Sequence, residues 1–432
     1  MSGTFFIPDP EVIPTSRVDL TFRLRSAMRY HREQTIPGLG GVWFVRQLSW
    51  AVAGLKLVQE NIKESPIRVA NAIEALGCKA EYQNNLDTYS FRGKRAFSRD
   101  QENDDTWNFR QLVQKRHYVQ ITYRQSTVRA LPSNIGLGFV EGEGIRFNTM
   151  HLSKLGESLA EAFLLKQESG IGRGNKAVVK FLSEWIQGQA GPGQYVDPQS
   201  ISQRLGPSYP TEKEKEIVLG RLNSFVTGGV CSDDQERRRR IVKYFKENDS
   251  GSWQDLLEKM AVSDEKARIH ANHLLNAKAF EDMRLSCVKL LDVSAMAMEN
   301  EDIGIPIVKL SQLQEIAHAF GEVTRSAEQY LSLIEKQGPY PRDAQVFASQ
   351  MVSENLKEKL SFLLARDGRI LQIIDGKVSK GPLFKTGFSE TDIHDEETGD
   401  NTPSEVNHEN PWVLNRLQQF HNLWLNCGGG TV

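Results

Sequence analysis

The sequence predicts a mainly α-helical, multi-domain protein. Apolar residues recur at helical spacing along most of the 432 residues. A chain of this length exceeds what one ordinary hydrophobic core holds. Only two short segments, one between residues 137 and 147 and one around residue 375, carry the alternation and turn residues of paired strands. We therefore expect helical domains with a small ribbon in the N-terminal part and a small β element near the C-terminus.

The composition is that of an ordinary globular protein. Hydrophobic residues make up 39% and charged residues 25%, and the formal net charge is -2. This near balance gives no overall attraction to nucleic acid or membrane, so any electrostatic contact has to be local. The four cysteines lie far apart and form no CxxC pair, as in a reduced protein. Because no signal peptide or apolar run of about 20 residues is visible, we expect a cytoplasmic protein without membrane contact.

The first predicted domain covers residues 1–168. Two helical patterns, 19–34 and 41–62, are separated by the breaker IPGLGG, and the second pattern is apolar on most faces. Ser65 and Pro66 then provide the N-cap and first residue of a third helix. This domain is expected to bury the second helix most deeply.

The first domain ends in the ribbon. A helix is expected over about Tyr123–Leu131, and Leu137–Val140 and Ile145–Phe147 alternate well enough to pair across a Gly-Glu-Gly turn. Ser153 is expected to N-cap a final helix. That helix has three apolar residues on one face: Leu155, Leu159 and Phe163.

The remaining chain is expected to form two further domains. Residues 176–360 contain a series of helical patterns and form the central α-helical domain. Residues 361–432 hold a β-hairpin around the Asp-Gly dipeptide at 375–376, an acidic loop and a terminal helix. The loop accounts for eight acidic residues and no Lys or Arg between Thr386 and Asn415.

The order of helix, ribbon and helix over about residues 113–163 resembles a winged helix-turn-helix domain. That resemblance implies that the helix before the ribbon reads duplex DNA and that the ribbon contacts a phosphate. In general character the chain also resembles uncharacterised winged-helix proteins of bacterial anti-phage defence clusters. This second resemblance implies a non-enzymatic DNA-binding or adaptor subunit of a multi-protein assembly.

Residue types and charge support candidate nucleic-acid contacts in two places. Between Arg92 and Arg129 there are nine basic and four acidic residues. Arg and Gln suit base edges, and hydroxyl groups suit the phosphate backbone. In the run ERRRRIVKYFKE, Arg237 shares one helix face with Arg240, three residues later, and with Lys243, six residues later. The candidate residues are Arg124, Gln125, Thr127, Arg129, Arg146, Arg237, Arg240 and Lys243.

Two acidic residues keep another function open for the same segment. Glu141 and Glu143 lie on the predicted ribbon, where a carboxylate would repel phosphate. Winged helices can also contact protein, so a scaffold that binds partner subunits is a second interpretation. In it, the acidic loop at 390–409 mimics or screens nucleic acid.

An enzyme is the third interpretation. Arg268 and His273 in RIHANH have the R-x4-H spacing of HEPN-type ribonucleases, which the segment therefore resembles. Similar Arg to His spacings occur four more times in the chain, so the pattern is unspecific. GIGRGNK fails the P-loop pattern, and His270 and His273 have no neighbouring metal ligands in the sequence. We expect no cofactor and no metal, and the sequence favours a non-enzymatic role.

Overall fold

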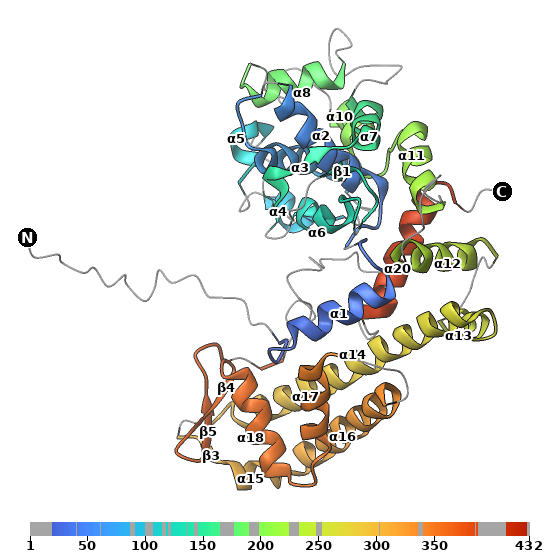
Figure 1. The fold of residues 1–432 in the computed structure, drawn as a ribbon. Coiled ribbons are helices and arrows are strands. Elements are labelled where there is room, and N and C mark those ends of the chain that lie inside the picture. Colours follow the sequence, from blue (N-terminus) through green and yellow to red (C-terminus); the bar gives the residue numbers. More distant parts are fainter. Residues whose placement is uncertain are drawn as a thin grey trace, which may run out of the picture. The chain divides into compact units, whose positions relative to one another are not determined.

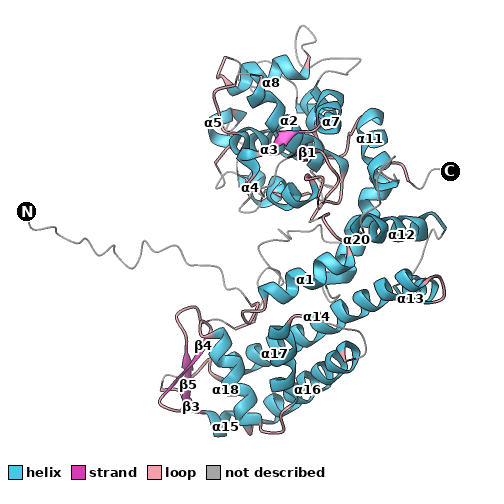
Figure 2. Ribbon diagram, in the orientation of Figure 1, coloured by secondary structure: helices cyan, strands magenta, loops and turns pink. Residues whose placement is uncertain are grey.

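The structure is a computed structural model of the chain, and it is mainly α-helical, as predicted (Figures 1 and 2). None of the helices in the part of the chain that the structure describes is both long and apolar enough to cross a lipid bilayer. The structure describes residues 20–39, 41–60, 62–86, 91–99, 107–114, 118–119, 122–134, 136–141, 146–164, 177–189, 198–223, 233–247, 253–301, 303–335, 340–384, 386–387 and 412–429.

The chain forms two compact units that are not contiguous in sequence. Unit 1 comprises residues 1–30 and 278–395, and unit 2 comprises residues 31–277 and 396–432. The three consecutive segments expected from the sequence, 1–168, 176–360 and 361–432, do not coincide with these units. Residues 278–395 are instead inserted, in sequence, between two parts of unit 2.

Unit 2 is built around two buried helices, α2 and α3. α2 has buried side chains on all its faces, as its sequence predicts, and α3 begins at Pro66 with Ser65 as its N-cap. Helices α6, α7, α10 and α11 pack against this pair. The elements that lie in unit 2 are α2 (Val45–Gln59), α3 (Pro66–Asn84), α4 (Lys94–Arg99), α5 (Phe109–Leu112), α6 (Tyr123–Thr127), η4 (Val128–Ala130), β1 (Val140–Glu141), η5 (Phe147–Thr149), β2 (His151–Leu152), α7 (Lys154–Leu164), α8 (Val178–Ile186), α10 (Pro198–Leu205), α11 (Glu212–Asn223), α12 (Asp233–Glu247), α13 (Trp253–Ala261) and α20 (Trp412–Asn426).

The ribbon pairs differently from the sequence prediction. β1 is antiparallel to β2, with Val140 opposite Leu152 and Glu141 opposite His151. Residues 147–149 form the 3-10 helix η5, so the predicted pairing of 137–140 with 145–147 is wrong. The reason is that the N–H groups of residues 137, 139 and 140 donate to the carbonyls of residues 130 and 131 instead. Residues 142–145 lie outside the described residues.

Other parts of the segment match the prediction. The helix expected over 123–131 is present as α6, and its last turn continues as the 3-10 helix η4. Ser153 is the N-cap of α7, because its Oγ accepts from Gly156 N at 3.1 Å, and it also donates to Gly138 O at 2.7 Å. Leu159 and Phe163 are buried and Leu155 is half-buried. Ser153 therefore joins the start of α7 to the residues before β1.

The predicted terminal helix is α20, and it packs in unit 2. It ends in a Schellman motif, in which Gly428 has φ +81 and Gly429 N donates to Trp424 O at 3.0 Å. Asn426 Oδ1 accepts from Val45 N at 2.9 Å and so caps the first turn of α2. Most of the predicted acidic loop before α20, residues 388–411, lies outside the described residues.

Unit 1 combines helices with the predicted hairpin. The hairpin is confirmed: β4 pairs with β5 across Asp375 and Gly376, which both have positive φ as a type I′ turn requires. β3 adds to the far edge of β5, giving the order β3-β5-β4. The elements of unit 1 are β3 (Ile305–Pro306), α15 (Ile307–Ser311), α16 (Gln314–Ile334), α17 (Arg342–Val352), α18 (Leu356–Asp367), β4 (Leu371–Ile374) and β5 (Lys377–Lys380).

Two helices contain the boundary between the units. The boundary at 30/31 falls inside α1 (Arg25–Thr35), and the boundary at 277/278 falls inside α14 (Glu265–Ala297). The first residues of α1 and the second half of α14 contribute apolar side chains to the core of unit 1. The first half of α14 contributes to the core of unit 2.

Two glycines inside helices of unit 2 should respond in opposite ways to substitution by alanine. A Cβ at Gly77 of α3 would lie 2.3 Å from Leu205 O of α10, so Gly77→Ala should lower the free energy of unfolding by about 1–3 kcal/mol. A Cβ at Gly220 of α11 meets no described atom within 4 Å, so Gly220→Ala should raise it by about 0.5–1 kcal/mol. Urea unfolding of both variants checks this, and an equal gain in both would contradict the close packing of α3 on α10.

Candidate functional site

The predicted recognition helix, α6, is fixed to α3 by a buried carboxylate. Glu74 of α3 accepts from the backbone N–H groups of Tyr123 and Arg124 at 2.9 and 2.8 Å. Thr122 and Gln125 complete a capping box at the same end of α6. These bonds satisfy the first N–H groups of a helix that is only five residues long.

The Arg124 side chain lies inside unit 2. Only 8% of the residue is exposed, its Nε donates to Asn71 Oδ1 at 2.8 Å, and its guanidinium lies 5.3 Å from the centre of the Phe147 ring. Burial lowers the pKa of Arg124, while Glu74 opposes that change. Arg124 therefore joins α3, α6 and η5, and its contacts are within the protein.

The Glu74 carboxyl group is correspondingly perturbed. Burial raises its pKa to about 7, and the bonds from the N–H groups of Arg124 and Tyr123 and the charges of Arg124 and Arg92 act in the opposite direction. Arg92 Nη1 also donates to Ser126 Oγ at 3.1 Å, and its guanidinium lies 4.5 Å from the centre of the Tyr123 ring. A buried polar cluster thus surrounds α6.

The other candidate residues of this region differ in their exposure. Thr127 is fully buried and donates to Tyr123 O at 2.8 Å, and Arg129 forms an ion pair with Glu33 at 2.7 Å. Gln125 and Arg146 are exposed. Of this group, Gln125 and Arg146 therefore present their side chains to solvent, and Arg124 and Thr127 do not.

The arginines on α12 also make most of their contacts within unit 2. Arg237 Nη1 lies 3.3 Å from Glu33 O and 3.5 Å from Asp234, and Arg240 lies 3.9 Å from Glu236. Lys243 is different, because its side chain is 73% exposed, with Glu247 at 3.8 Å. The predicted face of Arg237, Arg240 and Lys243 is therefore partly neutralised by carboxylates of its own helix.

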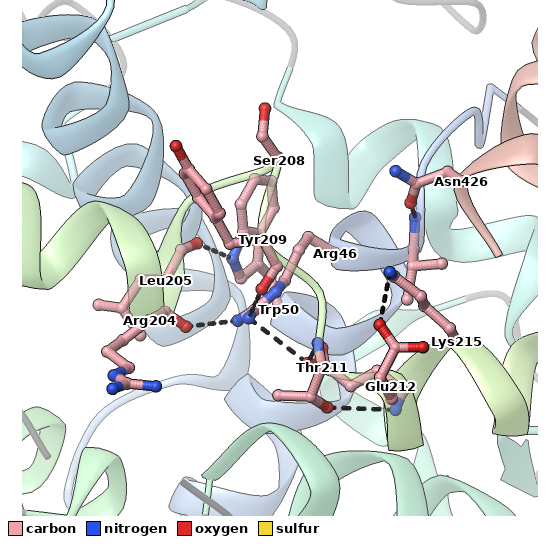
Figure 3. Close-up of polar contacts among 12 residues, drawn as sticks. Arg46, Trp50, Arg204, Leu205, Ser208, Tyr209, Thr211, Glu212, Lys215 and Asn426 are labelled. Carbon is pink, nitrogen blue, oxygen red and sulfur yellow. Dashed lines mark hydrogen bonds and ion pairs between the residues drawn. The ribbon is translucent and has the colours of Figure 1, made fainter. Parts of the chain in front are cut away.

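Two arginines of unit 2 that the sequence did not single out have extensive buried contacts. Arg238 donates to Pro37 O at 2.8 Å and to Gly136 O at 3.0 Å. Arg46 of α2 donates to the carbonyls of Arg204 and Tyr209 (Figure 3). It also forms an ion pair with Glu214 at 3.4 Å. Its place in a helix that is apolar on most faces is the signal that could have identified Arg46.

The Arg46 contacts hold the segment between α10 and α11 on α2. Trp50 Nε1 donates to Leu205 O at 2.9 Å in the same cluster (Figure 3). Glu214 Oε2 also accepts from Thr211 N at 2.8 Å, and Glu214 N donates to Thr211 Oγ1 at 3.2 Å. Glu214 therefore caps α11 and neutralises a buried cation at once.

Three histidines of unit 2 are buried or half-buried, and two of them, His270 and His273, lie near arginines of α12. Burial lowers the pKa of His31 and His270 to about 3 and that of His273 to about 4. The charges of Arg237 and Arg240 lower the pKa of His270 further, and His270 Nε2 donates to Thr35 O at 2.7 Å. All three histidines are neutral at pH 7.

The ribonuclease candidates lie on one helix of the predicted kind. Arg268 and His273 are both in α14, where Arg268 is exposed and His273 is half-buried. Five residues correspond to about 140° around a helix, so the two side chains leave α14 in different directions. Among the described residues, no group of three or more His, Cys, Asp or Glu side chains is placed to hold a metal ion.

Comparisons of the chain with protein-family models, with curated proteins and with solved structures found no match. The winged-helix and defence-cluster resemblances, and the ribonuclease interpretation, therefore stay predictions.

Replacement of Arg124 should affect stability directly. Arg124→Ala leaves the buried Asn71 Oδ1 without its donor and removes a charge that opposes the effect of burial on Glu74, so it should lower the free energy of unfolding by about 1–3 kcal/mol. Arg146→Gln changes an exposed side chain and should stay within about 0.5 kcal/mol of wild type. Urea unfolding followed by circular dichroism measures both, and an unchanged midpoint for Arg124→Ala would refute its structural role.

The histidines should make unit 2 less stable in acid. Their pKa values in the folded chain, about 3 to 4, are below the unfolded value of 6.5, so the unfolded chain binds more protons in this range. Their contribution is complete above pH 6.5 and is lost as the pH falls. Each histidine adds about 1.4 kcal/mol per pH unit to the slope near pH 5.

The variant His273→Gln tests the origin of this acid sensitivity. It should reduce the slope of unfolding free energy between about pH 5 and 6 by about 1.4 kcal/mol per pH unit. His151→Gln, at an exposed position of the same unit, is the control for the general effect of replacing a histidine by glutamine. Equal slopes for wild type and His273→Gln would show that His273 is solvated in the folded protein.

Proposed function

We propose that the chain is a non-enzymatic, DNA-binding adaptor subunit of a bacterial multi-protein assembly in the cytoplasm, of the kind found in anti-phage defence clusters. The observation that carries this proposal is the exposure of Arg146 and Lys154 at the two ends of the segment that contains η5 and β2. We name these two residues the ribbon surface. Gln125, also exposed, belongs to α6, which contacts the same segment through Arg124 and Phe147.

The proposed contact is to phosphates more than to base edges. Arg124, a predicted base reader of α6, and Thr127, a predicted backbone contact, have buried side chains, so the exposed basic groups supply the interaction. Contacts of this kind bind duplex DNA of any sequence, with a Kd of about 10⁻⁴ to 10⁻⁶ M at physiological salt. Glu141 and Glu157 are exposed nearby and favour the weaker end of that range.

A scaffold that binds partner proteins is the second proposal, and a different observation favours it. β4 lies at the edge of its sheet, and Ile373 and Ile374 on it are 38% and 49% exposed. An exposed apolar edge strand offers backbone N–H and C=O groups to a strand of another protein. In this alternative β4 is the contact and DNA binding is absent.

Salt-dependent DNA binding distinguishes the two proposals. Fluorescence anisotropy of a labelled duplex at about 50 and 200 mM salt should show binding by wild type that weakens with salt. Arg146→Gln should reduce the slope of log K against log salt by about 0.9, because one phosphate contact is lost. Lys180→Gln, at an exposed position on α8, is the matched control and should leave the slope unchanged.

The opposite outcome has a definite meaning. Wild-type protein that fails to bind the duplex at about 50 mM salt would eliminate the DNA-binding proposal and leave the scaffold. Binding that is equally weakened by Arg146→Gln and Lys180→Gln would place the contact outside the ribbon surface.

A further inference from the structure

Unit 1 carries a second basic surface that the sequence did not single out. Arg23, Arg25 and Arg29 are exposed on the turn before α1 and on its first two turns. We name these three residues the arginine surface. The apolar residues between them point inward, because Leu24 and Ala27 are fully buried and Met28 is 1% exposed.

The turn that presents Arg23 is firmly held. Residues 21–24 form a type I′ turn, with φ of 48 at Phe22 and 60 at Arg23 and a bond from Leu24 N to Thr21 O at 2.8 Å. The Phe22 ring stacks on Phe347 at 6.1 Å, and Arg366 donates to Phe22 O at 3.1 Å. The position of Arg23 is therefore set by the core of unit 1.

The arginines of α1 follow one helix face. Arg25 and Arg29 are four residues apart, so their side chains leave the same side of α1 with about 6 Å between them along the axis. Among the described residues, Arg23 and Arg29 have no ion pair with a carboxylate. At these two of the three positions, the described residues therefore leave the positive charge without a carboxylate partner.

A fourth cation lies beside this row. The charge of Arg23 lowers the pKa of Arg366 of α18, in addition to the larger effect of burial, and Asp343 acts in the opposite direction. Like charges that are held close together repel each other, and an anion placed between them would relieve that repulsion. The row thus has the electrostatics of a polyanion-binding surface.

We propose that the arginine surface binds the phosphate backbone of duplex DNA, as a contact additional to the ribbon surface. This inference rests on the proposed DNA-binding function and adds its main phosphate contact. Guanidinium groups bind phosphate in a bidentate manner, and protein–DNA interfaces are strongly basic and polar. A protein partner would need an apolar centre, and no large apolar side chain of residues 20–30 is among the exposed ones.

Neutralisation of the arginine surface tests the inference. The triple variant Arg23→Gln, Arg25→Gln and Arg29→Gln should reduce the slope of log K against log salt by about 2 to 3 for a labelled duplex. The matched control is Lys309→Gln, Arg325→Gln and Lys357→Gln, which removes the same charge from exposed positions elsewhere in unit 1. The control should bind DNA with the wild-type slope.

Thermal unfolding of each variant separates a binding effect from a folding effect. If the triple variant melts early, the single variant Arg29→Gln replaces it, with an expected reduction in slope of about 0.9. Arg29 contributes no side-chain bond to the described core, so that variant should fold as wild type does.

The possible failures can be told apart. Wild type without salt-dependent binding would refute the proposed function itself. Wild-type binding with an unchanged slope in the triple variant would overturn this inference and leave the proposed function in place. An equal reduction of the salt slope in the triple variant and in its control would also overturn this inference. So would a triple variant that loses binding to labelled poly-glutamate and keeps wild-type DNA binding, because that result would assign the surface to an acidic protein.

Discussion

The burial of guanidinium groups is the constraint on which unit 2 depends. An arginine keeps its charge in the protein interior, so removal from water is tolerated only where acceptors surround it. Arg46 finds them at the end of α10, on the loop after it and on Glu214, and Arg238 finds them at Pro37 and Gly136. The carbonyls of those loops need donors in turn. Each buried arginine therefore fixes an irregular segment against a helix, where apolar packing alone would leave its position loosely specified.

Elements whose signals are local could be predicted from the sequence. Ser65 and Pro66 mark the start of α3, and the Asp375-Gly376 turn defines the hairpin of β4 and β5, because caps and type I′ turns depend on residues within a few positions. The ribbon could not be predicted in the same way. Its pairing depends on which carbonyls are nearest in the fold, and residues 137–140 bond back to residues 130 and 131. The division into units could not be predicted, because the sequence was divided into consecutive segments, and such a division cannot show that residues 278–395 are inserted between two parts of unit 2.

The candidate site was predictable only at the level of residue type. Arg124 and Arg146 look alike in the sequence, yet one is held by Asn71 beneath η5 and the other is exposed. Whether a charge is available to a partner depends on its desolvation, which tertiary neighbours determine. Arg23 was missed for the opposite reason, because the helical pattern over 19–34 hid the turn that separates it from α1.

The discontinuity of unit 2 has a consequence for the order in which the protein is made. During translation, all of residues 278–395 leave the ribosome before α20 does. Until then α2 lacks Asn426 at its first turn, and the side chains that pack against Phe420 and Trp424 remain uncovered. At about 5–20 residues per second, synthesis of the inserted stretch and α20 takes roughly 8–30 s. All residues of unit 1 are therefore synthesised before the last helix of unit 2 is.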